Sequence, residues 1–405
     1  MDEDTRVNLH IIGAGPVGLL LTALLQSDER FSVHLYEKRR DYTRSRMVQL
    51  APYLVADSVA SYCTDYIDEE SIQAIFSPAE IEDGLTFRRS IPPDLMTLLR
   101  GWSHGFGPLN AIEHALSDLI DARQSHPVQR TTAVVTAEGA IAMLAPGDVL
   151  IDCTGAKSLL REALIPHDGA SSDDSANTFK IRLEYALVVT FLYGQAYDCN
   201  ELCKYAKNID NARYKFIPAV NRTYYDGSVS HVTGIVNISA DDYEQMPSHF
   251  DGAWLREHFP RVAESMDHFI DKIKEETHGE IVGDLEIIRI PLDLYRARNS
   301  TNREWLRTKR IGNPMTRSPV FLVGDSAMGS PYFQSISLGF ECAMFLAGLL
   351  SRRDEPLERM LERYELYAYK QWLRVYMRSK MIKHNKDLLE CVDDTFALLE
   401  RLHIY

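Results

Sequence analysis

The sequence lacks long apolar runs and organised cysteines, and each absence excludes a class of protein. No window reaches the roughly 18 uncharged apolar residues that a transmembrane helix needs. The six cysteines form no C-x-x-C pair, so neither a redox dithiol nor half of a zinc site is predicted, and a reducing compartment fits best. The acidic start, Met1-Asp-Glu-Asp-Thr-Arg, lacks the positive charge of a signal peptide. We therefore expect a cytoplasmic protein without integral membrane association and without a metal site.

Positive charge is also in deficit. The 405 residues include 44 Lys and Arg against 58 Asp and Glu, which gives a formal net charge of −14. A surface of this sign repels phosphate backbones, so nucleic acid is not an expected partner. With 45% hydrophobic residues, the chain is long enough to bury a large core in two or three lobes.

A glycine-rich turn near the start of the chain predicts a phosphate-binding loop. Residues 7–12 are an apolar, strand-like run, and an apolar helical stretch follows from Leu19 to Leu25. In such a turn the glycines allow a tight bend, close approach of a pyrophosphate and close helix–strand packing, while the helix N-terminus presents free N–H groups. The turn consists of Gly13, Ala14, Gly15, Pro16, Val17 and Gly18.

An acid at the end of the next strand strengthens this prediction. Residues 31–36 form a second strand-like run, and Glu37 follows it, 19 residues after Gly18. A carboxylate at this point is expected to bind ribose hydroxyls. It would repel a 2′-phosphate, so the sequence favours FAD or NAD over NADP as the resident nucleotide.

Two further strands end in glycine turns. The first runs from Asp148 to Asp152 and continues through Thr154 and Gly155. The second begins at Pro319 and breaks at Gly324-Asp325, and an apolar helix is expected over 339–350. Three such motifs do not fit a simple NAD dehydrogenase.

Together these motifs resemble the three fingerprints of the group A FAD-dependent monooxygenases, which have the para-hydroxybenzoate hydroxylase-like fold. Residues 37–50 look most like the kynurenine monooxygenase and MICAL-type branch, and the resemblance covers most of residues 7–350. It implies an α/β protein: a Rossmann-like FAD-binding domain, an inserted antiparallel or mixed β-sheet substrate domain and a helical C-terminal segment. The expected segments are FAD-binding parts at 1–75, 106–165 and 299–352, a substrate-domain excursion at 76–105, the substrate sheet at 166–298 and C-terminal helices at 353–405.

The resemblance also implies site residues beyond the first turn. Asp325 matches the aspartate that binds the ribityl side of FAD, and the helix behind it would face the flavin. Arg46 and Gln49 are candidates for contact with the flavin, with Arg44 as an alternative. Further cofactor-binding candidates are Lys38, Asn110, Gly155, Gly324, Pro331 and Gly339, and further catalytic candidates are Tyr295 and Arg296.

Departures from the family pattern indicate a divergent member. Thr154 stands where the middle motif usually has an acid, although Gly155 and Arg161 remain. Family members usually have an arginine at the start of the helix that is expected after Pro108, where this sequence has Asn110. They also commonly have a histidine in the third motif, where this sequence has Met328. These changes leave the handling of the reductant open.

The activity implied by the resemblance is hydroxylation or epoxidation of a small organic, aromatic or natural-product substrate. NADPH or NADH would reduce the flavin transiently, and oxygen would react through a flavin C4a-hydroperoxide. The alternatives are an FAD-dependent reductase, desaturase or cyclase on the same scaffold, or a non-catalytic flavoprotein that binds a partner. Halogenation is disfavoured because no lysine lies between Lys38 and Lys157.

The middle of the chain supplies tyrosines that are candidates for lining a pocket for a flat ligand: Tyr193, Tyr214, Tyr224, Tyr225 and Tyr295. On the strand at 291–298, Arg296 and Arg298 are candidates to receive a substrate carboxylate, and we expect at most one of them to reach it.

The tail from Pro356 to His403 has helical periodicity. Within it, residues 370–386 carry six positive charges and no acid. This stretch either contacts a membrane surface or partner, or complements an acidic surface within the same fold, and we favour the second interpretation.

Overall fold

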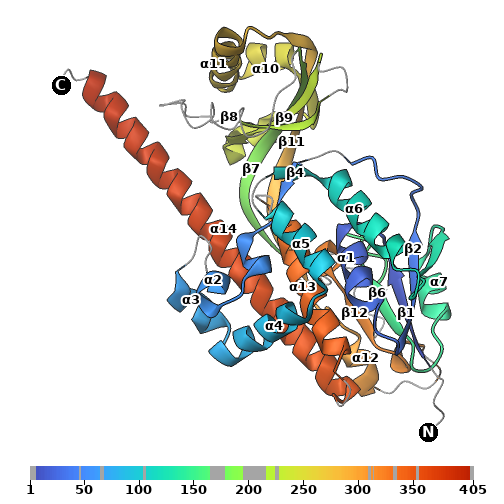
Figure 1. Ribbon diagram of the computed structural model, residues 1–405. Helices are drawn as coiled ribbons and strands as arrows, with labels where there is room; N and C mark the ends of the chain where they lie inside the picture. The colour runs from blue at the N-terminus through green and yellow to red at the C-terminus, as the bar shows by residue number, and fades with distance from the viewer. Residues whose placement is uncertain are drawn as a thin grey trace. The chain divides into compact units, whose positions relative to one another are not determined.

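In the computed structural model, the chain forms two compact units (Figure 1). Unit 1 comprises residues 1–43, 48–181 and 294–378, and unit 2 comprises 44–47, 182–293 and 379–405. Residues 76–105 belong to unit 1, together with the predicted nucleotide-binding segments. The structure describes residues 6–44, 47–63, 68–103, 106–164, 178–194, 216–223, 228–308, 312, 314–331, 335–352 and 355–401.

Unit 1 is built on a parallel sheet with the strand order β12-β6-β1-β2-β5. Each neighbouring pair of these strands is parallel. The two central strands are mostly buried, as expected for strands covered on both faces, although one of them includes Asn8 and His10. The strands are β1 (Val7–Ile12), β2 (Phe31–Glu37), β5 (Gln129–Thr132), β6 (Val149–Asp152) and β12 (Val320–Leu322), and the predicted strands are confirmed.

Helix α1 (Pro16–Leu25) is central to unit 1, and it packs against α6 (Leu109–Ala122) and α13 (Ser335–Leu350). Pro16 occupies its first turn, where the missing N–H has no intrahelical partner to lose. Helices α1 and α13 are apolar almost all round and nearly fully buried, because each is covered on several sides. Figure 1 shows these helices beside the parallel sheet.

The remaining elements up to residue 152 are β3 (Met47–Gln49), η1 (Pro52–Val55), α2 (Val59–Cys63), α3 (Glu69–Ile75), α4 (Pro78–Ser90), α5 (Pro93–Trp102), β4 (Phe106–Pro108) and α7 (Ala137–Ala142). Those after residue 300 are α12 (Arg303–Thr308), η3 (Pro314–Thr316), η4 (Gly324–Ser326), β13 (Met328–Gly329) and α14 (Leu357–Arg401). The capping box of Ser77 and Glu80 fixes the start of α4.

Most of unit 2 is an antiparallel sheet with helices. Its strand order is β10-β11-β7-β9-β8, and β9 pairs antiparallel with both β7 and β8. Beyond the sheet are α9 (Ala240–Gln245), α10 (Gly252–His258) and α11 (Pro260–Thr277). The strands are β7 (Thr178–Tyr193), β8 (Phe216–Thr223), β9 (Ser230–Ile238), β10 (His249–Asp251) and β11 (Ile281–Ala297), so β7 and β11 begin or end in unit 1.

The two faces of the unit 2 sheet differ in burial. Along β9, buried and half-exposed residues alternate without interruption. The buried face includes Tyr193, which lies with Phe191 and Val232 against Ile270 and Ile273 of α11 around a cavity of about 10 Å³. Tyr193 is therefore a packing residue on this face. Tyr214, Tyr224 and Tyr225 lie outside the described residues.

The predicted C-terminal helix is confirmed as α14, and part of its basic stretch is used within unit 1. The Lys370 ammonium pairs with Glu80 of α4. Arg374 is 1% exposed and donates to the Tyr62 carbonyl 3.0 Å away. Lys370 matches the favoured interpretation because it pairs with an acid, whereas Arg374 contacts a backbone carbonyl. A partner or membrane contact through 370–386 stays a prediction.

Among the described residues, no helix combines the length and the apolarity that crossing a membrane requires. The cytoplasmic location is not tested by this finding and stays a prediction.

Candidate cofactor site

Four neighbouring strands of unit 1 end at one edge of the sheet. Gly13 follows β1, Glu37 ends β2, Asp152 ends β6 and Gly324 follows β12. Because neighbouring parallel strands have their carboxyl ends on the same side, the predicted motifs meet at this edge, where open α/β sheets bind ligands.

The glycine turn closes only because two positions lack a side chain. Gly13 has φ +102°, and a Cβ there would lie 2.6 Å from the Cys153 carbonyl oxygen. A Cβ on Gly18 would lie 2.0 Å from the Gly13 carbonyl oxygen. The turn therefore brings β1, α1 and the end of β6 into direct backbone contact, and the N-terminus of α1 opens at Gly15.

The Glu37 carboxylate turns back toward this loop. Its Oε2 accepts a hydrogen bond from Ala14 N at 2.9 Å, and its Oε1 accepts from Arg39 N at 3.0 Å. The Arg39 guanidinium donates to both oxygens, at 3.0 and 3.2 Å. Burial opposes ionisation of Glu37, but the hydrogen bonds and charge of Arg39 outweigh it and lower the pKa of Glu37. Glu37 is therefore an anion beside the loop, as predicted.

A cavity of about 250 Å³ adjoins Glu37 between β2, β5 and α6. It is rich in cations and hydrogen-bonding groups, and its lining residues are Ala14, Leu35, Glu37, Arg39, Arg40, Asp41, Tyr42, His114, Ser117, Arg130, Thr131 and Thr132. The Arg39 guanidinium also lies 3.7 Å from Glu113, a fully buried carboxylate of α6. Arginines 39, 40 and 130 of this cavity were not anticipated from the sequence.

Asp152 organises the middle motif, although sequence reasoning had singled out position 154. The Asp152 carboxylate is fully buried. Its Oδ1 accepts from the Thr154 hydroxyl at 2.6 Å and from the Ser326 hydroxyl at 3.2 Å. Its Oδ2 accepts from the Ser158 hydroxyl at 2.7 Å and from Leu160 N at 3.1 Å. Asp152 is thus the acid that holds this turn, and Thr154 is one of its donors.

The third motif is tied to the second by Arg161. The Arg161 guanidinium donates to the carbonyl oxygens of Asp325 and Ser326 at distances from 2.9 to 3.1 Å. The Tyr295 hydroxyl donates to the same Asp325 carbonyl at 2.8 Å, and the Arg161 guanidinium lies over the Tyr295 ring. These bonds fix the backbone at Asp325, whose side chain is half-exposed while its neighbours are buried.

The first and third motifs are in contact through Val17. A Cβ on Gly324 would lie 3.2 Å from a Val17 methyl group, and a Cβ on Gly339 would lie 2.6 Å from one. The loop at 13–18, the turn at 324–325 and the start of α13 therefore pack together. This convergence is the condition on which the prediction of a single elongated cofactor depends.

The other predicted site residues are placed as follows. Lys38 is exposed, and Asn110 is the second residue of α6, where its Oδ1 accepts from Ala111 N at 3.0 Å. Pro331 is buried just before α13. Arg46 lies outside the described residues, as does the side chain of Gln49, whose backbone belongs to β3.

Tyr295 and Arg296, the two catalytic candidates on β11, are engaged in contacts within unit 1. Tyr295 supports the Asp325 backbone, as described above. The Arg296 guanidinium lies over the rings of Tyr369 and Trp372 of α14, 5.1 and 6.0 Å from their centroids. These contacts give both side chains structural partners, and a catalytic role for either stays a prediction.

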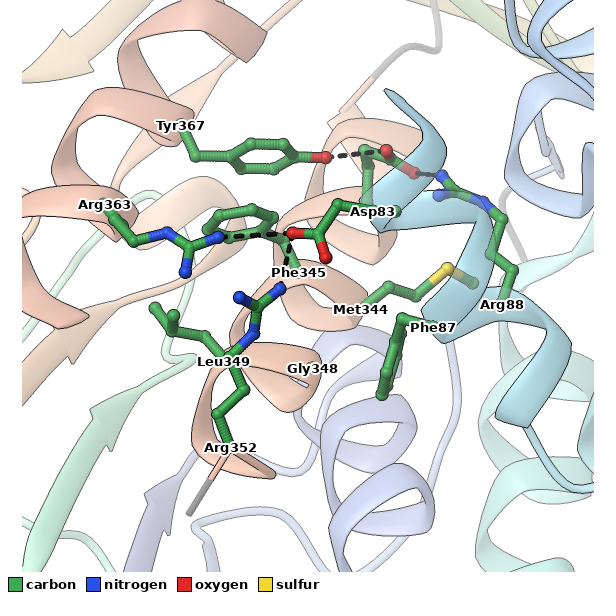
Figure 2. A pocket seen from close by; sticks show the side chains of 12 residues that line it. Asp83, Phe87, Arg88, Met344, Phe345, Gly348, Leu349, Arg352, Arg363 and Tyr367 are labelled. Atoms are coloured by element: carbon green, nitrogen blue, oxygen red, sulfur yellow. Dashed lines mark hydrogen bonds and ion pairs between the residues drawn. The ribbon is translucent and has the colours of Figure 1, made fainter. Parts of the chain in front are cut away.

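A smaller cavity lies elsewhere in unit 1, between α4, α13 and α14 (Figure 2). Its volume is about 30 Å³, which is room for about two water molecules and too little for an organic substrate. Ion pairs of Arg352 and Arg363 with Asp83 line it, and so does a buried pair of Arg88 with Glu341. We interpret this cavity as part of the packing between helices.

Comparison with known proteins supports the nucleotide-binding assignment of the N-terminal region. Residues 11–76 match the family model described as the NAD(P)-binding Rossmann-like domain. No curated protein matches the sequence.

Solved structures match nearly the whole chain. The tetrameric form of 2-methyl-3-hydroxypyridine-5-carboxylic acid oxygenase is 13% identical, with a TM-score of 0.50 over 96% of this chain and 93% of the oxygenase. A point mutant of the same oxygenase is 14% identical, with a TM-score of 0.51 over 95% and 93%. A Diels-Alderase of pyrroindomycin biosynthesis is 16% identical, with a TM-score of 0.49 over 98% and 77%.

The chain has the fold of 2-methyl-3-hydroxypyridine-5-carboxylic acid oxygenase. The predicted resemblance is therefore confirmed at the level of the fold: a Rossmann-like parallel sheet, a second antiparallel sheet and a helical C-terminal segment.

Proposed function

We propose that this chain is an FAD-dependent monooxygenase that uses NADH or NADPH and oxygen to hydroxylate or epoxidise a small organic substrate. The observation that carries the proposal is the packing of the turns at 13–18 and 324–325 around Val17, beside the ionised Glu37. A Rossmann-like domain alone would need only the first turn and the acid. The fixed third turn is the additional feature that an elongated flavin nucleotide uses.

The residues at the sheet edge fit FAD. The N-terminus of α1 would hold the pyrophosphate, since positions 13–18 place no bulky side chain between helix and ligand. Glu37 would bind the adenosine ribose through its ionised oxygens. Asp325, with a half-exposed side chain on a fixed backbone, would bind the ribityl chain.

When bound, the flavin supplies the redox and oxygen chemistry. The chain's own residues position it: Arg161 and Tyr295 hold the turn that carries Asp325, and Asp152 holds the turn that carries Gly155. Arg46 and Gln49 remain our candidates for contact with the flavin ring. A second Gly-x-Gly-x-x-Gly motif is absent from the sequence, so the reductant would bind transiently.

The half-exposed face of the unit 2 sheet supports an uncharged substrate. Thr190 of β7 lies opposite Thr233 of β9, with their hydroxyl oxygens 3.4 Å apart. Among the described side chains of β7 and β9 on this part of the face, none carries a fixed charge. They are Val188, Thr190, Leu192, His231, Thr233, Ile235 and Asn237. These side chains suit apolar groups and a few neutral hydrogen bonds. The position of β8 opposite His231 is Arg222, so carboxylated compounds belong in the test as well.

The test combines flavin reduction with oxygen uptake. The purified protein is reconstituted with FAD, reduced by NADH or NADPH without oxygen, and then exposed to oxygen with a panel of uncharged and carboxylated aromatic compounds. We expect uncharged compounds to stimulate NAD(P)H oxidation and to gain one oxygen atom, as detected by mass spectrometry. Glu29→Ala, a change at an exposed acid, serves as the control variant.

Other outcomes separate the alternatives. Flavin reduction without incorporation of oxygen would favour a reductase, desaturase or cyclase. Bound FAD that neither NADH nor NADPH reduces would remove the monooxygenase proposal and favour a non-catalytic flavoprotein.

A further inference from the structure

The acceptor sites of Glu37 are already filled within the protein. Its two oxygens receive four hydrogen bonds: one from Ala14 N, one from Arg39 N and two from the Arg39 guanidinium. A carboxylate offers about four lone-pair sites, so no site is left for a ribose hydroxyl. A nucleotide that uses Glu37 must therefore displace a donor. The backbone donors are fixed by the turn, and the guanidinium is the donor that can move.

A second acceptor lies beside the guanidinium. Glu113 Oε1 is 3.7 Å from Arg39 Nη2, beyond hydrogen-bond distance but within ion-pair range. Glu113 is fully buried on α6, where an anion needs a cationic neighbour. The Tyr42 ring, whose centroid is 5.9 Å from the Arg39 guanidinium, also lines the cavity. A small rotation of the Arg39 side chain exchanges one carboxylate partner for the other.

We propose that Arg39 is a displaceable occupant of the ribose position and thereby a determinant of which nucleotides bind. A nucleotide with a free vicinal diol replaces the guanidinium on Glu37 with two hydroxyl donors, and the guanidinium moves onto Glu113. The exchange conserves charge-assisted hydrogen bonds, because two N–H donors leave Glu37 and two O–H donors arrive. This inference rests on the proposed FAD site.

A ribose with one hydroxyl cannot complete the exchange. A 2′-deoxyribose offers a single donor in place of the two N–H groups, so one acceptor site on Glu37 would lose its partner. The cost of displacing Arg39 is the same for both nucleotides and cancels when they are compared in one protein. In the unmodified protein, however, a guanidinium N–H can return to the acceptor site that 2′-deoxyribose leaves empty, whereas in Arg39→Met nothing fills this site. Removal of Arg39 should therefore increase the preference for ADP over 2′-deoxy-ADP.

The test compares Arg39→Met with Arg40→Met, since Arg40 is an exposed arginine of the same cavity. The Kd values of the apoprotein are measured for FAD by quenching of flavin fluorescence, and for ADP and 2′-deoxy-ADP by calorimetry. Arg39→Met should lower the Kd for FAD and ADP by about threefold to tenfold, because no ion pair has to be broken. Arg40→Met should leave these values unchanged or raise them.

The role of Glu113 is tested in the same way. Glu113→Gln should raise the Kd for FAD, because the displaced guanidinium loses its acceptor. The double variant Arg39→Met/Glu113→Gln removes both charges and should retain the tighter binding, which guards against a folding defect of the single variant.

Three results would overturn the inference. An unchanged or raised Kd for FAD in Arg39→Met would show that Arg39 holds the nucleotide directly or plays no part. So would a ratio of 2′-deoxy-ADP to ADP affinity that is the same in Arg39→Met and the unmodified protein. An unmodified protein that binds neither FAD nor ADP would overturn the proposed function together with this inference.

Discussion

At the scale of a single residue, Glu37 both contacts the backbone of the phosphate-binding turn and is the proposed ligand of the ribose. Its carboxylate bonds to the loop through Ala14 N and is held ionised by Arg39, so the strand end and the phosphate-binding turn are joined by one side chain. The type and spacing of this residue were readable in the sequence. Its guanidinium partner was not, because several arginines follow Glu37 in the sequence, and only the path of the chain after β2 decides which of them reaches the carboxylate.

Replacing Glu37 with alanine should weaken FAD binding about tenfold to a hundredfold, since a hydrogen bond to a charged group contributes about 1.5 to 3 kcal/mol. The measurement is the FAD-to-protein ratio after purification and the Kd of the apoprotein. Glu29→Ala removes the same charge from an exposed turn and should leave both values unchanged. Equal occupancy in the two variants would remove Glu37 from the cofactor site.

Gly18 is a position of the same loop that has no room for a side chain. A Cβ at this position would lie 2.0 Å from the Gly13 carbonyl oxygen, which is backbone and cannot yield without moving β1. Gly18→Ala should lower the free energy of unfolding by about 3 kcal/mol or more and abolish FAD binding. Gly101→Ala is the matched control in α5, where a Cβ meets nothing within 4 Å, and it should stabilise the protein by up to about 1 kcal/mol. Urea unfolding of both variants checks this, and similar midpoints would contradict it.

At the scale of elements, the buried carboxylate of Asp152 organises the turn at the end of β6. Asp152 is fully buried and already receives the Thr154 hydroxyl, so an acid at 154 would place a second carboxylate against it. A second acid at position 154 is therefore expected to be unfavourable here, and the turn keeps its shape through bonds from Ser158 and Ser326.

The substitution Thr154→Asp tests this explanation. Thr154→Val removes only the hydroxyl donor and should cost about 1.5 to 3 kcal/mol of unfolding free energy. Thr154→Asp should cost more, since like charges in a buried site repel. The double variant Asp152→Gly/Thr154→Asp should recover part of the loss. If Thr154→Asp were no less stable than Thr154→Val by urea unfolding, the account of β6 would be wrong.

At the scale of the whole molecule, a buried ion pair makes stability depend on pH. Arg88 of α4 pairs with Glu341 of α13, and the Tyr367 hydroxyl donates to Glu341 at 2.7 Å (Figure 2). Burial opposes ionisation of Glu341, but the charge and hydrogen bond of Arg88 and the bond from Tyr367 outweigh it and lower its pKa from the usual 4.5. A carboxyl with a lowered pKa contributes stability that is complete above its unfolded pKa and is lost as the pH falls through the folded value.

We therefore expect the urea midpoint to fall as the pH drops below about 4.5. At pH 7, Arg88→Met should cost about 3 to 5 kcal/mol, because it leaves Glu341 buried and unpaired. The difference from the unmodified protein should shrink in acid, where Glu341 becomes neutral. The control is Arg89→Met, which removes an exposed pair with Glu82 on the same helix and should cost less than about 1 kcal/mol at either pH. A constant difference between Arg88→Met and the unmodified protein across this range would contradict the assignment.

Much of the fold and part of the site were predictable from local patterns. The runs at 7–12, 31–36 and 148–152 are mostly apolar and are followed by a glycine or an acid, so their strand character and the turns after them follow from nearby residues. The same holds for the glycines at 13 and 18 and for Glu37, whose roles depend on short spacings. The predicted helix at the C-terminus likewise follows from its periodicity.

The sequence by itself determined which residues can turn, which can be buried and which can carry charge, because these properties depend on a residue and its close neighbours in the chain. Only the tertiary structure decided which of these residues pair with one another through hydrogen bonds and ion pairs. Ser326 reaches Asp152 across 174 positions, Arg161 reaches Asp325, and Arg39 lies between Glu37 and Glu113. Such pairings depend on strand order and helix packing, since hydrogen bonds and ion pairs act over a few ångströms of space regardless of separation along the chain.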